Sequence, residues 1–567
     1  MLNGMTLRIS QLFSNGNKWL ETQQVSILSA AAIITAAVFL SSLTGLVRNR
    51  LLVTTFFKTP QLQMELEAYW VSFRLPELVF QLLVIGALSA AFIPVFTKYE
   101  KKSKQDAFLM ASSVLNLILL GFAIFSVFIF IFAVPLTRLM TGDGFSEAQI
   151  MLSANLTRVM LVAQFFFAIS NFLSGAIQSY QRFIIPALSP IAYNLGIILG
   201  TLLLSPYLGV YGPTIGVVLG SFLHFFLQLP LAKKLGFQYS FKINLSHPGV
   251  KEIIRLMGPR TLSLSIGQIQ IFSIVFFATQ LGGISLTIMS LAQQLMTFPI
   301  RIFGAPIGQA ALPFLSRESG EGDLSHFKAL VLRSLHQISF LAMPASILLL
   351  ILRIPIVRLA YGAKEFPWPA TLLTGRLVAI LTISIAAQAM THILIRAFYA
   401  LHNTKHPLSV SLFSTAIFLA LSVGSVFYFQ FGLLGLALAL TISSVFEMFL
   451  LLYLLNREVR GFDSAELWIP QLKMLVASFL MAVFIYLPFR IFDELIFDTT
   501  RTIELIGLTI IVSTIGMLTY LLFATLLEVK ELYMLRKVAT VITSWKTNLS
   551  RTTETMETAG QSDESAV

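Results

Sequence analysis

An arginine pair stands inside the first long apolar run of the sequence. Arg48 and Arg50 belong to the segment SSLTGLVRNRLLVTTFF, in which the oily run continues beyond them. A guanidinium inside a membrane helix costs several kcal/mol unless it faces water, a partner or a ligand. Arg48 is therefore a candidate anion-binding residue in a hydrophilic cavity. In the alternative interpretation the helix ends near Leu46, and both arginines extend to the membrane interface.

A second set of charged residues follows in the next apolar segment. Glu67, Arg74 and Glu77 are spaced so that all three lie near one face of a helix. One interpretation is a charged patch that lines a water-filled cleft. The other is a structural ion pair between Arg74 and Glu77 at a helix entrance. Pro76 predicts a bend in this helix.

Three further segments carry polar residues at helical spacing. The stripes are Arg260, Ser263, Gly267 and Gln270; Ser290, Gln294, Thr297, Arg301 and Gly308; and Ser384, Gln388, His392 and Arg396. A helix that is polar along one side is expected to face an aqueous cavity within a bundle. The alternative is hydrogen bonding between helices, at about 0.6 kcal/mol per bond. Several such stripes favour the cavity, and the candidate residues on them are Arg260, Gln294, Arg301 and Arg396.

The sequence lacks the motifs of the common catalytic sites. It has no G-x-x-x-x-G-K-[ST] for nucleotide phosphates, no H-E-x-x-H for zinc and no G-x-S-x-G with partner residues. It has no cysteine, which excludes a disulfide scaffold, a thiolate nucleophile and a cysteine-ligated metal. We therefore expect no catalytic residue, no metal site and no cofactor, and a protein that is not an enzyme.

The composition indicates the surroundings of these residues. Of the 567 residues, 56% are hydrophobic and only 12% are charged, whereas a soluble domain carries about a quarter charged residues. This composition is typical of an all-α polytopic membrane protein and argues against a chain of soluble domains. The formal net charge of +12 indicates topology and contact with anionic lipids rather than nucleic-acid binding.

Apolar runs of about 20 residues, the length of a transmembrane helix, recur along the chain. We count about fourteen runs, centred near 27–57, 69–96, 107–135, 155–180, 186–206, 211–231, 261–284, 286–315, 327–352, 370–400, 407–428, 432–455, 471–491 and 503–527. The candidate residues fall within these runs or directly beside them.

Three sequence blocks of the first half recur in the second half. SAAFIPVFTK resembles QAALPFLSR, AIQSYQRFIIP resembles AFYALHNTKHP, and LGVYGPTIG resembles FGLLGLALA, each at an offset of roughly 220 residues. The repeat predicts two pseudo-symmetric six-helix lobes, with a substrate site between them as in many transporters. The predicted parts are an interfacial N-terminal segment, two lobes, a C-terminal helix pair and a partly disordered tail, at 1–24, 25–235, 250–456, 470–528 and 529–567.

Loop charges predict the orientation in the membrane. With the N-terminus in the cytoplasm, the inner loops and tail hold roughly 23 lysines and arginines and the outer loops about 9, which is the positive-inside pattern. Both termini are therefore expected in the cytoplasm.

Several blocks carry a family resemblance, among them GLVRNRLL, EAYWVSFRLPELVFQLLVIGALSAAFIPVFTKY, LMGPRTLSLSIGQIQ, FGAPIGQAALPFLSR and RAFYALHNTKHP. Over about residues 25–530 the chain is similar to the MurJ/MviN lipid II flippases of the MATE-like exporter superfamily. The resemblance implies two six-helix lobes and a terminal helix pair that helps form a groove for a polyprenyl tail. It also implies transport of a lipid-linked glycan across the bacterial inner membrane, with membrane lipids and cell-wall synthesis proteins as further partners.

The family binds the diphosphate of its substrate with cavity arginines, and this sequence keeps part of that pattern. Arg48 matches the family's second arginine of the first helix, and Glu67 stands where the family usually has an aspartate. The family's other charged positions are occupied here by Ser42, Phe80 or Gln81, Ile85, Gln293 and Gln294. Because a diphosphate needs cationic or multiple-donor partners, the available candidates are Arg48, Arg260, Arg301 and Arg396. Either the site has been rebuilt, or the substrate differs, or transport has been lost.

The preferred hypothesis is a lipid II flippase that works by alternating access, because a hydrophilic cavity lowers the barrier of about 30 Å of hydrocarbon for a polar head. One alternative is an exporter of another lipid-linked polysaccharide or of an amphiphilic drug. A second is a non-transporting scaffold with the same fold, which the missing charges motivate. A membrane glycosyltransferase is disfavoured because the outer loops are short.

Overall fold

The computed structural model describes residues 27–85, 92–319, 324–362 and 364–533, and all the regular structure in these ranges is helical. The fold class predicted from composition is confirmed. The predicted N-terminal segment 1–24 and most of the predicted tail lie outside the described residues.

The described residues up to Lys234 form eight helices. They are α2 (Ile27–Phe56), α3 (Pro60–Ser72), α4 (Arg74–Phe80), α5 (Ile93–Glu100), α6 (Lys104–Met140), α7 (Glu147–Ser179), α8 (Ile184–Leu208) and α9 (Tyr211–Lys234). The helices after the connecting segment 235–247 are α10 (Pro248–Gln280), α11 (Ser285–Pro299), α12 (Ala305–Glu318), α13 (Ser325–Ile351), α14 (Arg353–Tyr361), α15 (Trp368–Thr382), α16 (Ile385–Ala400), α17 (Lys405–Val423), α18 (Gly432–Glu458), α19 (Ser464–Ile491) and α20 (Thr502–Leu526). Short π-helical turns extend four of them, namely η1 (Gln81–Ile85), η3 (Ile300–Gly304), η4 (Gly424–Tyr428) and η5 (Phe492–Ile496).

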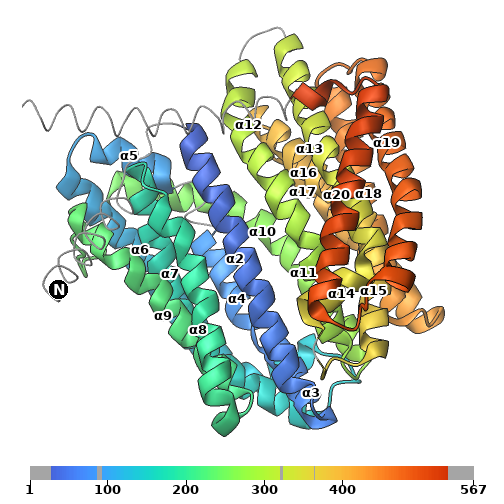
Figure 1. The fold of residues 1–567 in the computed structure, drawn as a ribbon. Coiled ribbons are helices and arrows are strands. Elements are labelled where there is room, and N and C mark those ends of the chain that lie inside the picture. The colour runs from blue at the N-terminus through green and yellow to red at the C-terminus, as the bar shows by residue number, and fades with distance from the viewer. Residues whose placement is uncertain (1–26, 86–91, 320–323, 363, 534–567) are drawn as a thin grey trace, which may run out of the picture.

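The two parts of the chain gather on opposite sides of the molecule. In Figure 1, helices α6 to α9 lie together on one side, and α13 and α15 to α20 lie on the other. Helices α2, α10 and α11 run between the two groups. The first part is called the N-half below and the part from α10 onward the C-half. Their relation by duplication stays a prediction.

Ten of the described helices are long and apolar enough to cross a membrane, or eleven if the bent pair α15 and α16 counts as one span. The prediction of about fourteen spans is therefore not confirmed as a count and stays a prediction. The expected segments that do not qualify are those near 69–96, 261–284 and 286–315. Breaks divide the first and the last of them, and within the described residues the apolar helix of the second, Leu264–Gln280, is shorter than a span.

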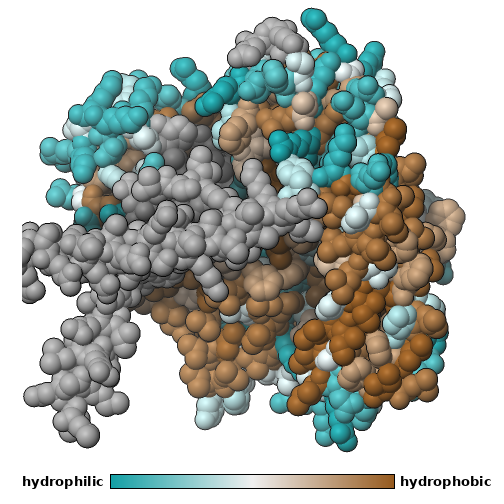
Figure 2. Space-filling model, turned by 45° about the horizontal axis from the view of Figure 1, so that its top comes forward, coloured by the Kyte–Doolittle hydropathy of each residue, from teal (hydrophilic) through white to brown (hydrophobic). Residues whose placement is uncertain are grey.

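An apolar surface surrounds the middle of the molecule. Figure 2 shows hydrophobic residues over the middle of the visible face and hydrophilic residues at both ends. On α6 this surface includes Ile124, Val127 and Ile131, each about 60% exposed. Exposed side chains of this kind are stable when lipid rather than water surrounds them. The molecule is thus built as a multi-pass membrane protein.

The break between α3 and α4 follows from Pro76. Proline lacks the N–H that would bond the carbonyl of Ser72, and its ring clashes with that carbonyl. The helix ends at Ser72 and resumes at Arg74. The Ser72 carbonyl oxygen instead accepts a hydrogen bond from Thr157 Oγ1 of α7 at 3.1 Å. Pro76 thus accounts for the break at Phe73, and the predicted bend stays a prediction.

The chain beyond α20 begins packed against the C-half. Glu531 is buried, and its Oε1 lies 3.6 Å from His336 Nδ1 of α13. The Tyr533 hydroxyl accepts a hydrogen bond from Arg333 Nε at 2.7 Å. The first five residues of the predicted tail, 529–533, are therefore part of the folded structure.

Glycines allow α8 and α9 to approach closely. A Cβ on Gly200 would lie 2.5 Å from the Gly216 Cα and 2.6 Å from the Gly212 carbonyl oxygen, so the backbone itself leaves no room for a side chain. Small residues at such spacing are typical of close helix packing in membranes. This pair supports one wall of the cavity described below.

Gly200→Ala is therefore expected to destabilise the protein, because overpacking against backbone costs about 1–3 kcal/mol. The measurement is the apparent melting temperature of the purified protein in detergent, which should fall by several degrees.

Gly267→Ala is the matched control. Gly267 lies within a helix, and among the described residues no side chain and no other helix comes within 4 Å of an added Cβ. Alanine should therefore leave the melting temperature unchanged or raise it. An equal effect of both substitutions would contradict the packing argument.

Candidate functional site

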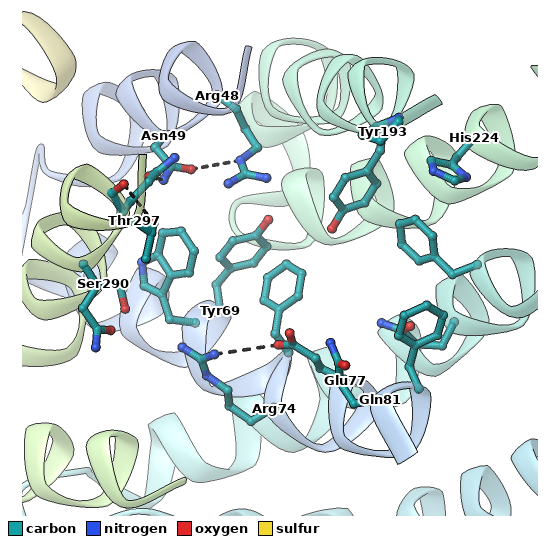
Figure 3. A pocket seen from close by; sticks show the side chains of 18 of the residues that line it. Arg48, Asn49, Tyr69, Arg74, Glu77, Gln81, Tyr193, His224, Ser290 and Thr297 are labelled. Carbon is teal, nitrogen blue, oxygen red and sulfur yellow. Dashed lines mark hydrogen bonds and ion pairs between the residues drawn. The ribbon is translucent and has the colours of Figure 1, made fainter. Parts of the chain in front are cut away.

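A cavity of about 580 Å³ lies between the two halves. Its walls come from α2, α3, α4, η1, α7, α8 and α9 of the N-half and from α11 and η3 of the C-half. Figure 3 shows the charged and polar side chains around this space. The lining residues are Arg48, Asn49, Tyr69, Trp70, Phe73, Arg74, Glu77, Phe80, Gln81, Gln164, Phe167, Asn171, Pro190, Tyr193, His224, Ser290, Gln293, Gln294, Thr297 and Arg301.

Arg48 lies in the cavity wall and is held by two asparagines. Its Nε donates to Asn49 Oδ1 at 2.9 Å, and its Nη1 donates to Asn194 Oδ1 of α8 at 2.9 Å. The amide of Asn49 in turn donates to Gln294 Oε1 on α11, across the two halves. Since α2 continues to Phe56, the alternative in which the helix ends near Leu46 is wrong. The side chain is partly buried and oriented by neutral partners, so its positive charge stays available.

Arg74 and Glu77 belong to the same cavity and also form a pair. Arg74 Nη1 lies 3.8 Å from Glu77 Oε2, with side-chain exposures of 20% and 38% (Figure 3). Both interpretations of these residues are therefore correct: Arg74 and Glu77 form a weak ion pair, and that pair lines the cleft. Its length and exposure indicate that either group can exchange its partner for a ligand.

The second polar stripe faces the cavity for most of its length. Ser290, Gln294, Thr297 and Arg301 all line it, whereas Gly308 packs against α16. Arg301 is exposed and also lines a neighbouring cavity of about 250 Å³, together with Ser42. The two cavities share Arg48, Pro190, Tyr193, Gln294, Thr297 and Arg301. They are therefore adjacent parts of one hollow.

Glu67 does not line this cavity. Its side chain is 2% exposed, and its two oxygens accept hydrogen bonds from the backbone N–H groups of Leu286 at 3.2 Å and Thr287 at 2.6 Å. Helix α11 has no side-chain cap from its own N-cap residue, so Glu67 of the N-half supplies it. A carboxylate at this position also interacts favourably with the helix dipole. Glu67 is therefore buried against α11 and, unlike Arg74, is not among the residues that line the cavity.

Further contacts join the two halves at the same end as Glu67. Arg50 Nη1 donates to the Leu359 carbonyl oxygen of α14 at 2.7 Å. The rings of Phe57 and Phe366 lie 5.2 Å apart between centroids. The loop after α6 joins α10 through a hydrogen bond from the Gly142 N–H to Thr279 Oγ1 at 2.9 Å. These contacts seal the cavity at this end of the molecule.

The third polar stripe bonds within the C-half instead of facing the cavity. Ser384 is fully buried, and Gln388 Nε2 lies 3.6 Å from Met296 Sδ of α11. Arg396 donates from Nη1 to the His392 carbonyl oxygen at 2.8 Å, and it does not line the cavity. For this stripe the alternative of interhelical hydrogen bonding holds. The side chain of Arg260 lies outside the described residues.

The sequence analysis missed several neutral lining residues. Tyr69 and Tyr193 project into the space beside Arg48 (Figure 3). His224 lines the far wall, where its Nδ1 lies 2.6 Å from Ser170 Oγ. Single polar residues in an apolar helix give no periodic signal. The one available signal was that asparagine, glutamine and histidine occur within membrane segments, where polar side chains are costly.

The arrangement suits the binding of an anion with a polar body. Three arginines and one glutamate line the main cavity, and amides and phenols supply further hydrogen-bonding groups. Among the described residues there is no cluster of histidine and acidic side chains that could hold a metal ion. This lining provides groups that can bind and orient such a ligand.

Sequence comparisons give one consistent family. The sequence profile described as "Lipid II flippase MurJ" matches residues 61–506. The lipid II flippase MurJ of Burkholderia cenocepacia is 26% identical over 465 residues, which cover 81% of this chain and 89% of that protein. The probable lipid II flippase MurJ of Bdellovibrio bacteriovorus is 25% identical over 524 residues, covering 91% and 98%.

Structural comparisons show the same fold. A structure described as "Lipid II flippase MurJ, inward closed conformation" matches with a TM-score of 0.71 and 24% identity, covering 88% of this chain and 98% of that chain. An inward-facing multidrug resistance MATE family transporter of the MOP superfamily matches with a TM-score of 0.60 and 17% identity, covering 76% and 98%.

Glu67→Gln is expected to weaken the seal between the halves. Hydrogen bonds to a charged group contribute about 1.5–3 kcal/mol, so losing the charge should raise the population of the unsealed state by about tenfold. Because the chain has no cysteine, spin labels can be placed uniquely at Met64→Cys and Lys364→Cys, one on each half. Pulsed electron spin resonance should then show a new population at longer distance.

The control is Glu65→Gln on the same helix. The Glu65 carboxylate bonds the Val210 backbone within the N-half, so the distance distribution should stay that of the parent. Identical distributions for the parent and Glu67→Gln would refute the sealing role.

Proposed function

This chain belongs to the MurJ family of lipid II flippases, and on that premise we propose that it carries lipid II from the inner to the outer leaflet of the bacterial inner membrane. In this proposal both termini are cytoplasmic and the sealed end faces the outside. The protein carries out no covalent chemistry on its substrate. Cell-wall synthesis proteins that consume the product are its proposed partners.

The observation that carries the proposal is the set of guanidinium groups in a cavity between two halves of a membrane protein. Arg48 and Arg74 come from the N-half and Arg301 from the C-half. Arginine forms short, bidentate hydrogen bonds with phosphate oxygens. A diphosphate between the halves can therefore contact both of them, and its binding energy depends on their separation.

Unpaired donors in the cavity wall support the same substrate chemistry. Arg74 Nε, Trp70 Nε1 and Ser290 Oγ are buried and have no hydrogen-bond partner in the described structure. Each such group costs about 1–3 kcal/mol when it stays unpaired. Small movements of the wall would let a ligand rich in oxygen acceptors satisfy them, and a sugar diphosphate is such a ligand.

A separate apolar cavity suits the lipid tail. It measures about 400 Å³ and lies between α13, α16, α18 and α19. Its lining includes Met343, Met390, Met448, Trp468 and Leu472. Methionine side chains adapt to irregular apolar ligands. We propose that this cavity receives part of the polyprenyl chain while the head occupies the central cavity.

The proposed mechanism is alternating access. The head enters the cavity from the cytoplasmic side while Glu67 and its neighbouring contacts keep the outer end closed. Opening of those contacts, with closure on the inner side, then exposes the head to the outside. Since the sequence has no P-loop, direction has to come from the membrane potential, an ion gradient or consumption of the product.

A second candidate is export of another lipid-linked glycan. The observation in its favour is that Phe80, Gln81, Gln293 and Gln294 line the cavity at positions where the family resemblance leads us to expect charges. Amides recognise neutral sugars and peptides as well as anions. Assays with a panel of lipid-linked sugars distinguish the two candidates, because only the preferred head should be flipped fast.

Arg48→Ala is expected to lower the flipping of lipid II in reconstituted vesicles by at least about tenfold, since it removes a charge-assisted contact worth about 1.5–3 kcal/mol. Arg301→Ala should act in the same direction. The measurement is the rate at which labelled lipid II becomes accessible on the opposite leaflet.

Arg138→Ala is the matched control, because Arg138 is exposed and pairs with Glu147 away from the cavity. All variants should show the melting temperature of the parent. Undiminished flipping by Arg48→Ala and Arg301→Ala would remove the proposed anion site. An absence of flipping by the parent protein for every lipid-linked sugar would instead favour a non-transporting scaffold.

A further inference from the structure

A second polar cavity, separate from the central one, lies within the C-half, where α14 and α15 meet the C-terminal pair α19 and α20. It measures about 320 Å³ and is bounded by α14, the start of α15, the end of α19 with η5, and the start of α20. Its polar and aromatic lining residues include Arg353, Arg358, Trp368, Tyr486, Arg490 and Asp493. None of these six residues lines the central cavity.

Two of its arginines have no carboxylate partner. Within the described residues, no carboxylate oxygen lies within 4.0 Å of the Arg353 or Arg358 guanidinium. Arg353 Nη1 donates to the Leu350 carbonyl oxygen at 2.9 Å. The Arg358 guanidinium carbon lies 5.9 Å from the centre of the Trp368 ring. Both side chains are therefore oriented without an ion pair among the described residues, and Asp498 interacts with Arg358 only at longer range.

The third arginine is already paired and supplies a contrast. Arg490 forms an ion pair with Glu494 and donates from Nε to the Tyr486 hydroxyl at 3.3 Å. Asp493 is the one carboxylate among the lining residues. The lining thus has an excess of positive charge, located on Arg353 and Arg358.

The remaining wall of the cavity is apolar and continues into the lipid-facing surface. Ile351, Ile354, Phe489 and Leu505 line it, and the neighbouring Leu487, Leu495 and Ile503 are among the most exposed apolar side chains. A ligand bound here meets guanidinium groups on one side and hydrocarbon on the other. That combination fits an amphiphile with a phosphate head and not a soluble anion.

The position along the helices places this cavity at a membrane interface. Helix α13 ends at Ile351 and α20 begins at Thr502, so the spans reach their ends here. Under the positive-inside pattern this is the outer side, where the predicted loops hold few basic residues. Three arginines in one outer cavity are more than simple anchoring of helix ends requires.

We propose that this cavity binds the phosphate head of an anionic membrane amphiphile of the outer leaflet, with Arg353 and Arg358 as its phosphate ligands. Arg358 stacked on Trp368 gives the planar guanidinium a fixed orientation for two parallel hydrogen bonds to phosphate oxygens. The acyl or prenyl chain then leaves along Leu505. The inference does not depend on the transport proposal, because an anionic phospholipid and a flipped prenyl phosphate present the same chemistry.

The test is native mass spectrometry of the delipidated, detergent-solubilised full chain with added lipids. Phosphatidylglycerol and undecaprenyl phosphate are the two amphiphilic probes, phosphatidylcholine is the neutral lipid, and inorganic phosphate is the soluble anion. We expect saturable binding of at least one anionic lipid. The double substitution Arg353→Gln and Arg358→Gln should weaken that binding by about tenfold or more.

Two further variants keep the test independent of folding. Thr499→Glu places a carboxylate in the cavity wall without changing either arginine, and it should lower binding to a similar degree. Arg138→Gln removes an exposed arginine elsewhere and should leave binding unchanged. A preference for undecaprenyl phosphate or for phosphatidylglycerol identifies the source of the head.

Three results would overturn the proposal. They are equal anionic-lipid binding by the parent and both cavity variants, equal binding of phosphatidylcholine, and binding of inorganic phosphate as tight as that of the lipids. If a variant still binds the anionic lipid but no longer flips lipid II, the result bears on the transport proposal for the central cavity and leaves the lipid-binding proposal in place.

Discussion

The cost of a guanidinium in hydrocarbon is the constraint on which this structure depends. Arg48, Arg74 and Arg301 come from three helical segments of two halves, and none can face lipid without a penalty of several kcal/mol. All three avoid it by facing one hollow. Of the segments that line it, α3 with α4 and α11 with η3 are broken and do not qualify as membrane spans, whereas α2, α7 and α8 do.

The same constraint explains the contact that closes the hollow. Glu67 is a buried carboxylate between the halves, and its charge is compensated by the backbone N–H groups at the start of α11 and by no arginine. A carboxylate held by backbone donors is stable while the helix end stays in place and becomes costly when it moves away. Glu67 is thus one of several contacts that hold this end closed, together with those of Arg50, Phe57 and Gly142. Water must reach Glu67 when that end opens.

The sequence predicts much of this arrangement and fails at identifiable points. Composition and apolar length are sufficient for the all-α membrane fold, and the spacing of Ser290, Gln294, Thr297 and Arg301 correctly predicts one cavity-lining face. The same reasoning fails for Glu67 and Arg396. Periodicity states which residues share a helix face, but it does not state which neighbour that face meets. The break caused by Pro76 is readable in the sequence, whereas the contact of Glu67 with the start of α11 depends on how the two halves pack.

The replaced charges of the central cavity bear on how a carrier of this kind releases its cargo. Gln293 and Gln294 line the cavity beside Arg301, and the resemblance to the flippase family leads us to expect an acidic and a basic residue there. Replacing one acidic and one basic side chain by two amides leaves the net charge of the cavity unchanged. It removes the strong electric field near each of the two charges. A transported ion has to be bound well enough to enter and weakly enough to leave. Amides give hydrogen bonds that exchange with water at small cost, so three arginines with neutral neighbours can attract a diphosphate without trapping it. The physical requirement for transport is therefore a modest positive potential in a wet cavity, and the residues that replace the family's charges still meet it.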